Sequence, residues 1–402
     1  MSRRLLLKGA SLAGRPTNVL IENGIVVATG PIDADIDADV HDLSGHVLLP
    51  GFVEPHAHLD KAFLADRVPN PAGDLMGAIV GLESVRHTIT HDDIVERACR
   101  AAALMSRNGT TAVRAHADTT VSGGLASVDA LLETKRRCAD FIRIEVAMLL
   151  EWPLTGPGAT DRHSLARDAV AAGVDVIGGC PHLDPDPRGA VEWLLDFAVS
   201  NGLPLDLHAD ENLRADSSDL EHLADLMIDR GIVHPANAGH CVSLSTRNPE
   251  AARRIADKVA TAGISVTALP QTNLFLQGRG SATDVPRAIA PVDLLRRAGV
   301  VVAAGQDNLQ DPFNLMGRAD QLEIASLMVV AAHDSVDDAV ALVTTGAGRI
   351  VHGRDVSIAV GNEADIVAVR ATTVREAVAT GPLDRFVVHG GVVISDHTRN
   401  RK

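Results

Sequence analysis

The feature that most constrains the fold is an alternation of short apolar runs with helical apolar patterns between about residues 47 and 350. Parallel strands need helical crossovers between them, so this alternation predicts an α/β fold with a parallel sheet. Periodicity places eight strands near residues 47–58, 111–118, 141–150, 174–180, 203–210, 236–241, 264–270 and 300–307. It places helices over residues 92–107, 127–138, 164–172, 188–201, 217–230 and 249–262.

Eight strands with intervening helices in about 300 residues fit a (β/α)8 TIM barrel. An open doubly wound sheet is the alternative, but it normally carries a glycine-rich phosphate loop, and no GxGxxG occurs in the chain. Both ends of the chain are rich in short strands, which predicts a small β-sandwich domain built from the two ends together. The expected domains are therefore residues 1–50 plus 354–402 for the composite β domain and 51–353 for the barrel.

Composition excludes several classes of partner. Aromatic residues make up only 2% of the 402 residues and Tyr is absent, so a base-stacking surface for single-stranded nucleic acid is not expected. The formal net charge of −15 repels phosphate backbones, so no nucleic-acid partner is predicted. No apolar stretch reaches the roughly 18 residues of a membrane span, so no membrane partner is expected either.

The N-terminal residues and the cysteines bear on location. Arg3-Arg4 followed by Leu5-Leu6-Leu7 resembles a twin-arginine export signal, but Lys8-Gly9 interrupts the apolar run that such a signal needs. We expect a strand there instead. The four cysteines form no CxxC pair and are too few for a disulfide framework, which favours a reducing, cytoplasmic location.

A histidine pair suggests a metal site. His56 and His58 end the first predicted strand, and residues two apart on a strand face the same side. Alone this pair is weak, because chance gives about 0.7 such pairs among 17 histidines in 402 residues. Three further strands end similarly, however, and the carboxyl ends of barrel strands share one rim. The side chains expected on that rim are His56, His58, His208, Glu211, His240 and Asp307.

These residue types suit hydrolysis at one divalent ion. Neutral imidazoles and a carboxylate bind such an ion and leave a position for water, whose pKa the ion lowers towards about 7. Glu211 is placed to move protons, and His240 is either a ligand or a second proton carrier. The strand at 174–180 offers no Lys that could bridge two metals, which favours a single ion. Zn is favoured, while Fe and Mn accept the same ligands.

The ordered set of motifs resembles the amidohydrolase superfamily and, within it, the cytosine deaminase-like branch. The similarity covers nearly the whole chain. The matching segments are Leu49-Pro50-Gly51-Phe52-Val53-Glu54-Pro55-His56-Ala57-His58-Leu59-Asp60, Val176-Ile177-Gly178-Gly179-Cys180-Pro181-His182, His208-Ala209-Asp210-Glu211, Leu269-Pro270-Gln271-Thr272-Asn273-Leu274-Phe275-Leu276-Gln277-Gly278-Arg279, Gly305-Gln306-Asp307-Asn308 and Asp311-Pro312-Phe313.

This resemblance implies a role for each matching residue. Glu211 would protonate the ring nitrogen beside the attacked carbon, and His240 would lie beside the water without binding the metal. Asp307 would also take a proton from that water. The implied reaction is attack of metal-bound hydroxide on an amidine-type ring carbon with loss of ammonia or an amine. The implied metal ligands are His56, His58, His208 and Asp307.

The predicted substrate pocket departs from the cytosine deaminase pattern. Leu150 stands where those enzymes carry a Gln that reads the pyrimidine edge, Asn308 replaces an Asp, and Phe313 replaces a Trp. Since Leu cannot form a hydrogen bond, a cytosine amide edge would lose a partner worth about 1–3 kcal/mol. The residues expected to contact substrate are Leu150, Glu151, Trp152, His182, Gln277, Asn308 and Phe313.

The sequence therefore predicts a metal-dependent deaminase of a small cytosine-like nitrogen heterocycle other than cytosine. One alternative is hydrolysis of a cyclic amide or release of a substituted amine at the same metal site. Another is a metal- or ligand-binding protein without catalysis, which the retained Glu211 and His240 disfavour. The expected partner is a small heterocyclic substrate. Large barrels of this kind are often oligomeric, so a homo-oligomer is a further expectation.

Overall fold

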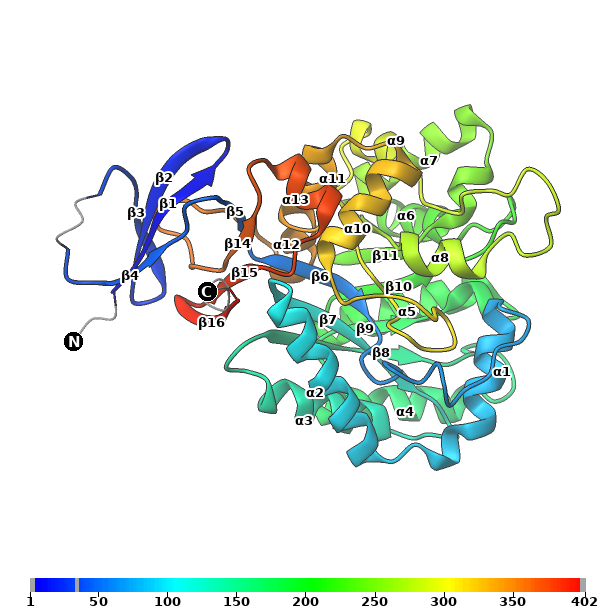
Figure 1. The fold of residues 1–402 in the computed structure, drawn as a ribbon. Coiled ribbons are helices and arrows are strands. Elements are labelled where there is room, and N and C mark those ends of the chain that lie inside the picture. Colours follow the sequence, from blue (N-terminus) through cyan, green and yellow to red (C-terminus); the bar gives the residue numbers. More distant parts are fainter. Residues whose placement is uncertain (1–3, 33–35, 398–402) are drawn as a thin grey trace.

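The computed structural model describes residues 4–32 and 36–397 and contains two eight-stranded sheets. In Figure 1 the sheet made from both chain ends lies beside the helix-covered sheet. The first sheet consists of β1 (Arg4–Leu12), β2 (Arg15–Glu22), β3 (Ile25–Gly30), β4 (Asp39–Asp42), β5 (His46–Pro50), β14 (Ile366–Arg370), β15 (Arg385–His389) and β16 (Val392–Asp396).

The ends of the chain meet because β5 pairs antiparallel with β14, with Leu48 opposite Ala368. The strand order is β16-β15-β14-β5-β1-β2-β3, and β4 pairs with β1. A turn at Asn23-Gly24 joins β2 to β3, and the strand predicted in place of an export signal is β1. Residues 1–3 lie outside the described residues. We propose that the domain boundaries fall near residues 50 and 354.

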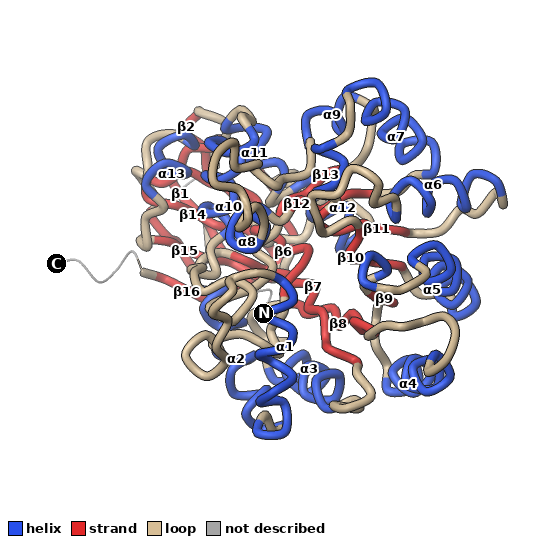
Figure 2. Tube along the Cα trace, turned by 90° about the vertical axis from the view of Figure 1, so that its right-hand side faces the viewer, coloured by secondary structure: helices blue, strands red, loops and turns tan. Residues whose placement is uncertain are grey.

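The second sheet is a parallel barrel in which all eight predicted strands appear. Its order runs from β13 to β6 without interruption, and a parallel bridge between Ala57 and Asp307 joins its two edges. Figure 2 shows these strands enclosed by helices. The strands are β6 (Phe52–Ala57), β7 (Thr110–Thr119), β8 (Arg143–Leu150), β9 (Ile177–Gly179), β10 (Leu205–Ala209), β11 (Ala236–His240), β12 (Ser265–Ala268) and β13 (Val302–Ala304).

One strand prediction was wrong in detail. The run at 47–58 is two strands, β5 and β6, which belong to different sheets and meet at Gly51. Both are buried, so the apolar pattern continues across the junction. An added Cβ at Gly51 would lie 2.6 Å from the Oγ1 atom of Thr111, so only glycine fits where the chain passes between the sheets.

The six predicted helices are present, and local residues explain their ends. The Asn248 side chain caps the start of α7 by accepting a hydrogen bond from the Ala251 backbone N–H, and Gly263 ends α7 in the left-handed region with φ of 71°. The helices are α1 (Leu75–Val85), α2 (His91–Arg107), α3 (Ala126–Arg137), α4 (Ala159–Ala172), α5 (Pro187–Asn201), α6 (Asp219–Asp229), α7 (Pro249–Ala262), α8 (Pro270–Leu276), α9 (Val292–Arg297), α10 (Gln321–Leu327), α11 (Val336–Leu342), α12 (Thr345–His352) and α13 (Val374–Thr380). None of the helices within the described ranges has the length and apolar character that a membrane span requires.

Candidate metal centre and active site

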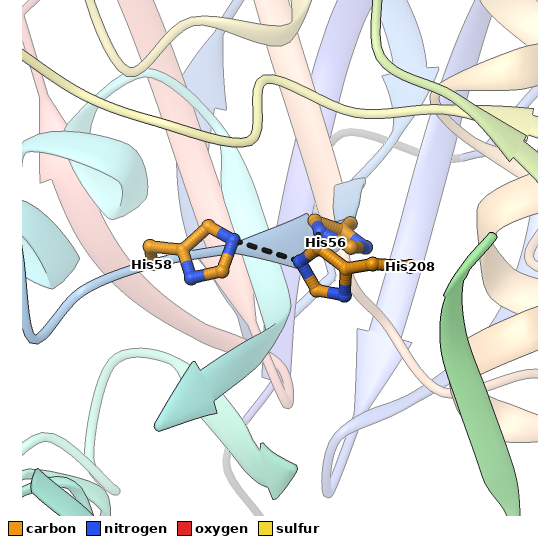
Figure 3. A group of neighbouring side chains, drawn as sticks. All are labelled: His56, His58 and His208. Carbon is orange, nitrogen blue, oxygen red and sulfur yellow. Dashed lines mark hydrogen bonds between the residues drawn. The ribbon is translucent and has the colours of Figure 1, made fainter. Parts of the chain in front are cut away.

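Four predicted ligand atoms converge at the carboxyl ends of the barrel strands. Nε2 of His208 lies 3.1 Å from Nε2 of His56 and 3.2 Å from Nε2 of His58. Oδ1 of Asp307 lies 3.1 Å from Nε2 of His58 and 3.7 Å from Nε2 of His56. All four side chains are buried, and Figure 3 shows the three imidazoles turned toward one point.

The spacing and surroundings of these atoms fit a divalent ion. Tetrahedral ligands at about 2.0–2.1 Å from zinc lie about 3.3 Å apart, close to the distances above. Among the described residues, no hydrogen bond of normal geometry reaches either carboxylate oxygen of Asp307. Burial raises the pKa of Asp307 and lowers the pKa values of the three histidines, which keeps the imidazoles in the neutral, metal-binding form. A bound cation would supply the positive charge that compensates the negative charge of the buried Asp307 carboxylate.

The backbone holds the predicted ligands at the seam where the barrel closes. The N–H of Asp307 donates to the carbonyl of His56 at 2.9 Å, and the N–H of His58 donates to the carbonyl of Asp307 at 3.2 Å. Asp307 and His240 have φ values of 69° and 68°, in a region that residues with a Cβ rarely adopt. Such strained backbones concentrate at functional sites.

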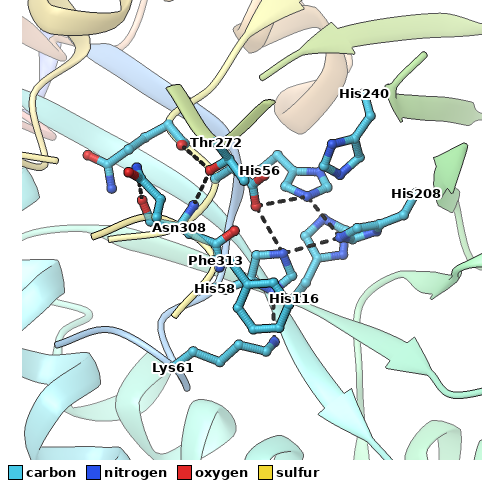
Figure 4. Close-up of polar contacts among 12 residues, drawn as sticks. His56, His58, Lys61, His116, His208, His240, Thr272, Asn308 and Phe313 are labelled. Carbon is cyan, nitrogen blue, oxygen red and sulfur yellow. Dashed lines mark hydrogen bonds and ion pairs between the residues drawn. The ribbon is translucent and has the colours of Figure 1, made fainter. Parts of the chain in front are cut away.

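Glu211 and His240 lie beside the ligand cluster. Oε1 of Glu211 is 3.5 Å from Nδ1 of His240, and burial raises the pKa of Glu211 to about 8. The Asn273 side-chain amide donates to Nδ1 of His240 at 3.1 Å, so the hydrogen of this imidazole is on Nε2. Figure 4 shows His240 beside His56 and His208. A protonated carboxyl group and an N–H donor therefore face the same region.

A pocket opens above these groups, and several predicted substrate residues line it. They are Leu150, Glu151, Trp152, Asn308 and Phe313. The amide of Asn308 donates to the carboxylate of Asp311 at 2.8 Å, which leaves its carbonyl oxygen as an acceptor. Leu150 is 1% exposed and presents only apolar surface.

His182 and Gln277 were predicted to contact substrate, but neither is among the residues that line the pocket. His182 is buried, with Nε2 3.9 Å from Oε2 of Glu211. Gln277 donates from Nε2 to the backbone carbonyl of Glu211 at 3.1 Å. Both residues therefore lie next to Glu211 without lining the pocket.

The sequence interpretation missed one wall of the pocket. Helix α1 contributes Leu75, Ile79 and Leu82, and Arg86 follows it. Asp74 caps this helix by accepting from the Gly77 backbone N–H at 2.8 Å. An Asp followed by this apolar spacing is a helix-start signal that could have located the wall.

A charged cluster forms part of the same wall. Nζ of Lys61 lies 2.6 Å from Oδ1 of Asp118 and 3.0 Å from Nδ1 of His58. Arg86 reaches the other oxygen of Asp118 at 3.2 Å. Burial opposes the charge of Lys61, but Asp118 and Asp60 together raise its pKa above the ordinary value. Lys61 thus forms a buried ion pair with Asp118 and a longer one, at 3.5 Å, with Asp60.

Comparison with known proteins places this geometry in context. The amidohydrolase family model matches residues 82–394. A pterin deaminase of Rhizobium rhizogenes is 30% identical over 395 residues, which is 95% of this chain and 90% of that protein.

Two solved structures are similar over almost the whole chain. A 5-methylcytosine deaminase from Klebsiella pneumoniae, liganded with phosphonocytosine, has 27% identity and a TM-score of 0.88 over 97% of each chain. An N-isopropylammelide isopropylaminohydrolase from Burkholderia multivorans has 28% identity and a TM-score of 0.85 over 98% of this chain and 99% of that one.

Proposed function

The chain belongs to the amidohydrolase family, and from this premise we propose that it is a metal-dependent hydrolytic deaminase of an aminated nitrogen heterocycle, releasing ammonia. The observation that carries the proposal is the placement of Glu211 and His240 beside four converging ligand atoms, at an apolar pocket. A binding protein without catalysis has no use for a buried proton donor at that place.

Each residue has a part in this proposal. His56, His58, His208 and Asp307 hold the divalent ion, with zinc as our choice. When bound, such an ion makes a water molecule nucleophilic near neutral pH. Glu211 gives its proton to the ring nitrogen beside the attacked carbon, and the Nε2–H of His240 donates to the oxygen that develops negative charge.

For the substrate, we place pterin-type heterocycles ahead of cytosine. Support comes from the 30% identical pterin deaminase, whose likeness extends over 95% of this chain. The buried Leu150 offers no hydrogen bond to the amide edge of cytosine. Apolar walls from Leu149, Leu150 and Trp152 on one side and helix α1 on the other suit a flat ring system.

The test is ammonia release by metal-loaded protein from pterins, cytosine, 5-substituted cytosines, isocytosine, creatinine and aminotriazines. The control is Glu211→Gln, which preserves shape and removes the acid. We expect turnover of a pterin and a loss of at least about 10²-fold in the variant at unchanged metal content. No ammonia from any compound, or full activity of Glu211→Gln, would contradict the proposal.

Release of a substituted amine is the second candidate. The structural likeness to an N-isopropylammelide isopropylaminohydrolase, at 28% identity, favours it. Product analysis separates the two reactions, because an alkylamine appears in place of ammonia.

We also propose a cytoplasmic location, since Cys99, Cys138, Cys180 and Cys241 are all free thiols.

A further inference from the structure

His182 has a fixed tautomer. It lies in the short 3-10 turn Pro181–Leu183 after β9, and its side chain is 2% exposed. Its Nδ1 is 2.9 Å from the backbone carbonyl oxygen of His208. A carbonyl oxygen only accepts, so Nδ1 carries the hydrogen and Nε2 carries a lone pair.

That lone pair faces Glu211. Nε2 of His182 has no hydrogen-bond partner among the described residues and lies 3.9 Å from Oε2 of Glu211. On the other side of the carboxyl group, Nδ1 of His240 faces Oε1 at 3.5 Å and already accepts a hydrogen bond from Asn273. Both imidazole nitrogens that face Glu211 are therefore acceptors.

Two acceptors around a carboxyl group favour its protonated form. An ionised carboxylate also has only acceptor atoms, so it would face two lone pairs without a hydrogen between them. A neutral carboxyl group has one O–H, and a small rotation of the Glu211 side chain that closes the 3.9 Å separation lets this O–H donate to the His182 nitrogen. An interaction made with the neutral form raises the pKa of an acid.

We propose that His182 is a positioning residue that accepts the hydrogen of the Glu211 carboxyl group and keeps this group in its acid form between turnovers. This inference rests on the proposed function, in which Glu211 is the proton donor. During reaction the O–H bond of Glu211 breaks and an N–H bond forms on the substrate ring. As the water attacks, a C–O bond forms, and the C–N bond to the amino group breaks as ammonia leaves. One proton of that water goes to the ammonia and the other returns to the Glu211 carboxylate.

Other titratable groups also face Glu211. They are Cys180 from the segment that carries His182, His240 at the end of β11, and Asp307 after β13. Burial raises the pKa of the Cys180 thiol, so this group stays neutral. A substitution at His182 also removes one of the causes that lower the pKa of His240, but burial is the larger cause and keeps His240 neutral.

Two substitutions test the roles of the two ring nitrogens of His182 one at a time. In His182→Asn the side-chain amide can still donate to the His208 carbonyl but offers no acceptor at the Nε2 position. In His182→Gln the amide can reach the Nε2 position but loses the bond to His208. A role in holding His208 predicts a defect in the Gln variant, whereas our proposal predicts a defect in the Asn variant.

The measurements are kcat against pH and metal content for both variants. For His182→Asn we expect normal metal content and a kcat about tenfold lower. We also expect the fall of kcat at high pH, where Glu211 loses its proton, to begin about one pH unit lower. His182→Gln should keep the wild-type limb. A wild-type profile in His182→Asn, or equal loss of metal and unchanged profiles in both variants, would overturn the proposal.

A second measurement needs no substrate. The infrared carbonyl band of protonated Glu211 is identified at neutral pH as the difference between the wild type and Glu211→Gln. We expect this band to shift or disappear in His182→Asn and to persist in His182→Gln. Absence of turnover on every heterocycle would refute the proposed function alone, whereas a band indifferent to both substitutions would refute the role of His182.

Discussion

Glu54 accepts a hydrogen bond from the backbone N–H of Gln306 at 2.9 Å, across the seam where the barrel closes. Its other carboxylate oxygen accepts from the backbone N–H of His56 at 3.0 Å. The amide of Gln321 donates to the same carboxylate at 2.7 Å. One buried side chain thus ties β6, which carries the proposed ligand His56, to the residue that precedes the proposed ligand Asp307.

Glu54→Gln should weaken this seam. The amide of Gln brings an NH2 group against donors that now meet an oxygen, so at least one N–H loses its partner. We expect the free energy of unfolding to fall by about 1–3 kcal/mol and metal to be lost more readily. Urea denaturation and metal analysis measure both. Glu192→Gln, at a half-exposed surface site, is the control, and equal stability of the two variants would contradict this role.

Arg385 connects the sheet made from both chain ends to the barrel. This residue of β15 is fully buried and forms two hydrogen bonds to Asp320, at 2.9 and 2.7 Å, and a further bond to the carbonyl of Asn108. Arg385→Ala leaves Asp320 buried without its partner, so we expect a loss of about 3–5 kcal/mol in unfolding free energy. Arg370→Ala on the exposed face of β14 should change it little. Denaturant titration distinguishes these outcomes.

Much of the barrel could be predicted because buried parallel strands are continuous apolar runs. The convergence of His56, His208 and Asp307 could be predicted because these residues fall where those runs end. The apolar pattern could not reveal that the chain changes sheets at Gly51, since the residues on both sides are buried. The pattern also could not predict the direction of the His182 side chain, which lies 3.9 Å from Glu211 and does not line the pocket. Such directions depend on turns after the strands, which periodicity does not describe.

Removal of the metal should destabilise the protein. Without a cation, the buried Asp307 has no hydrogen bond of normal geometry from the described residues and lies among three neutral imidazoles. An ion at about 100 times its Kd adds about 2.7 kcal/mol to the free energy of unfolding. Thermal unfolding before and after chelation, and after return of Zn, Fe or Mn, measures this effect. In Asp307→Asn the response to added metal should be reduced, and a full response there would contradict its role as a ligand.

Glu211 should reduce stability in a manner that depends on pH. Burial raises its pKa from 4.5 to about 8, so the folded protein keeps a proton that the unfolded chain releases. For this group, stability is complete below pH 4.5 and is lost as the pH rises to about 8. Glu211→Gln does not titrate, so its advantage in unfolding free energy should grow with pH by up to about 1.4 kcal/mol per unit. Denaturation of both proteins at several pH values tests this, and a constant difference would be incompatible with the raised pKa.

Leu150 should set the preference against cytosine. It ends β8 and lines the pocket with apolar surface only, so the amide edge of a pyrimidine finds no partner there. Leu150→Gln supplies both a donor and an acceptor at that place. We expect kcat/KM for cytosine to rise tenfold to hundredfold relative to the best wild-type substrate, which corresponds to about 1–3 kcal/mol. Leu150→Met is the matched control, since it alters shape without adding hydrogen-bonding groups. An equal change in both variants would assign the preference to pocket shape, and no change in either would place specificity elsewhere in the pocket wall.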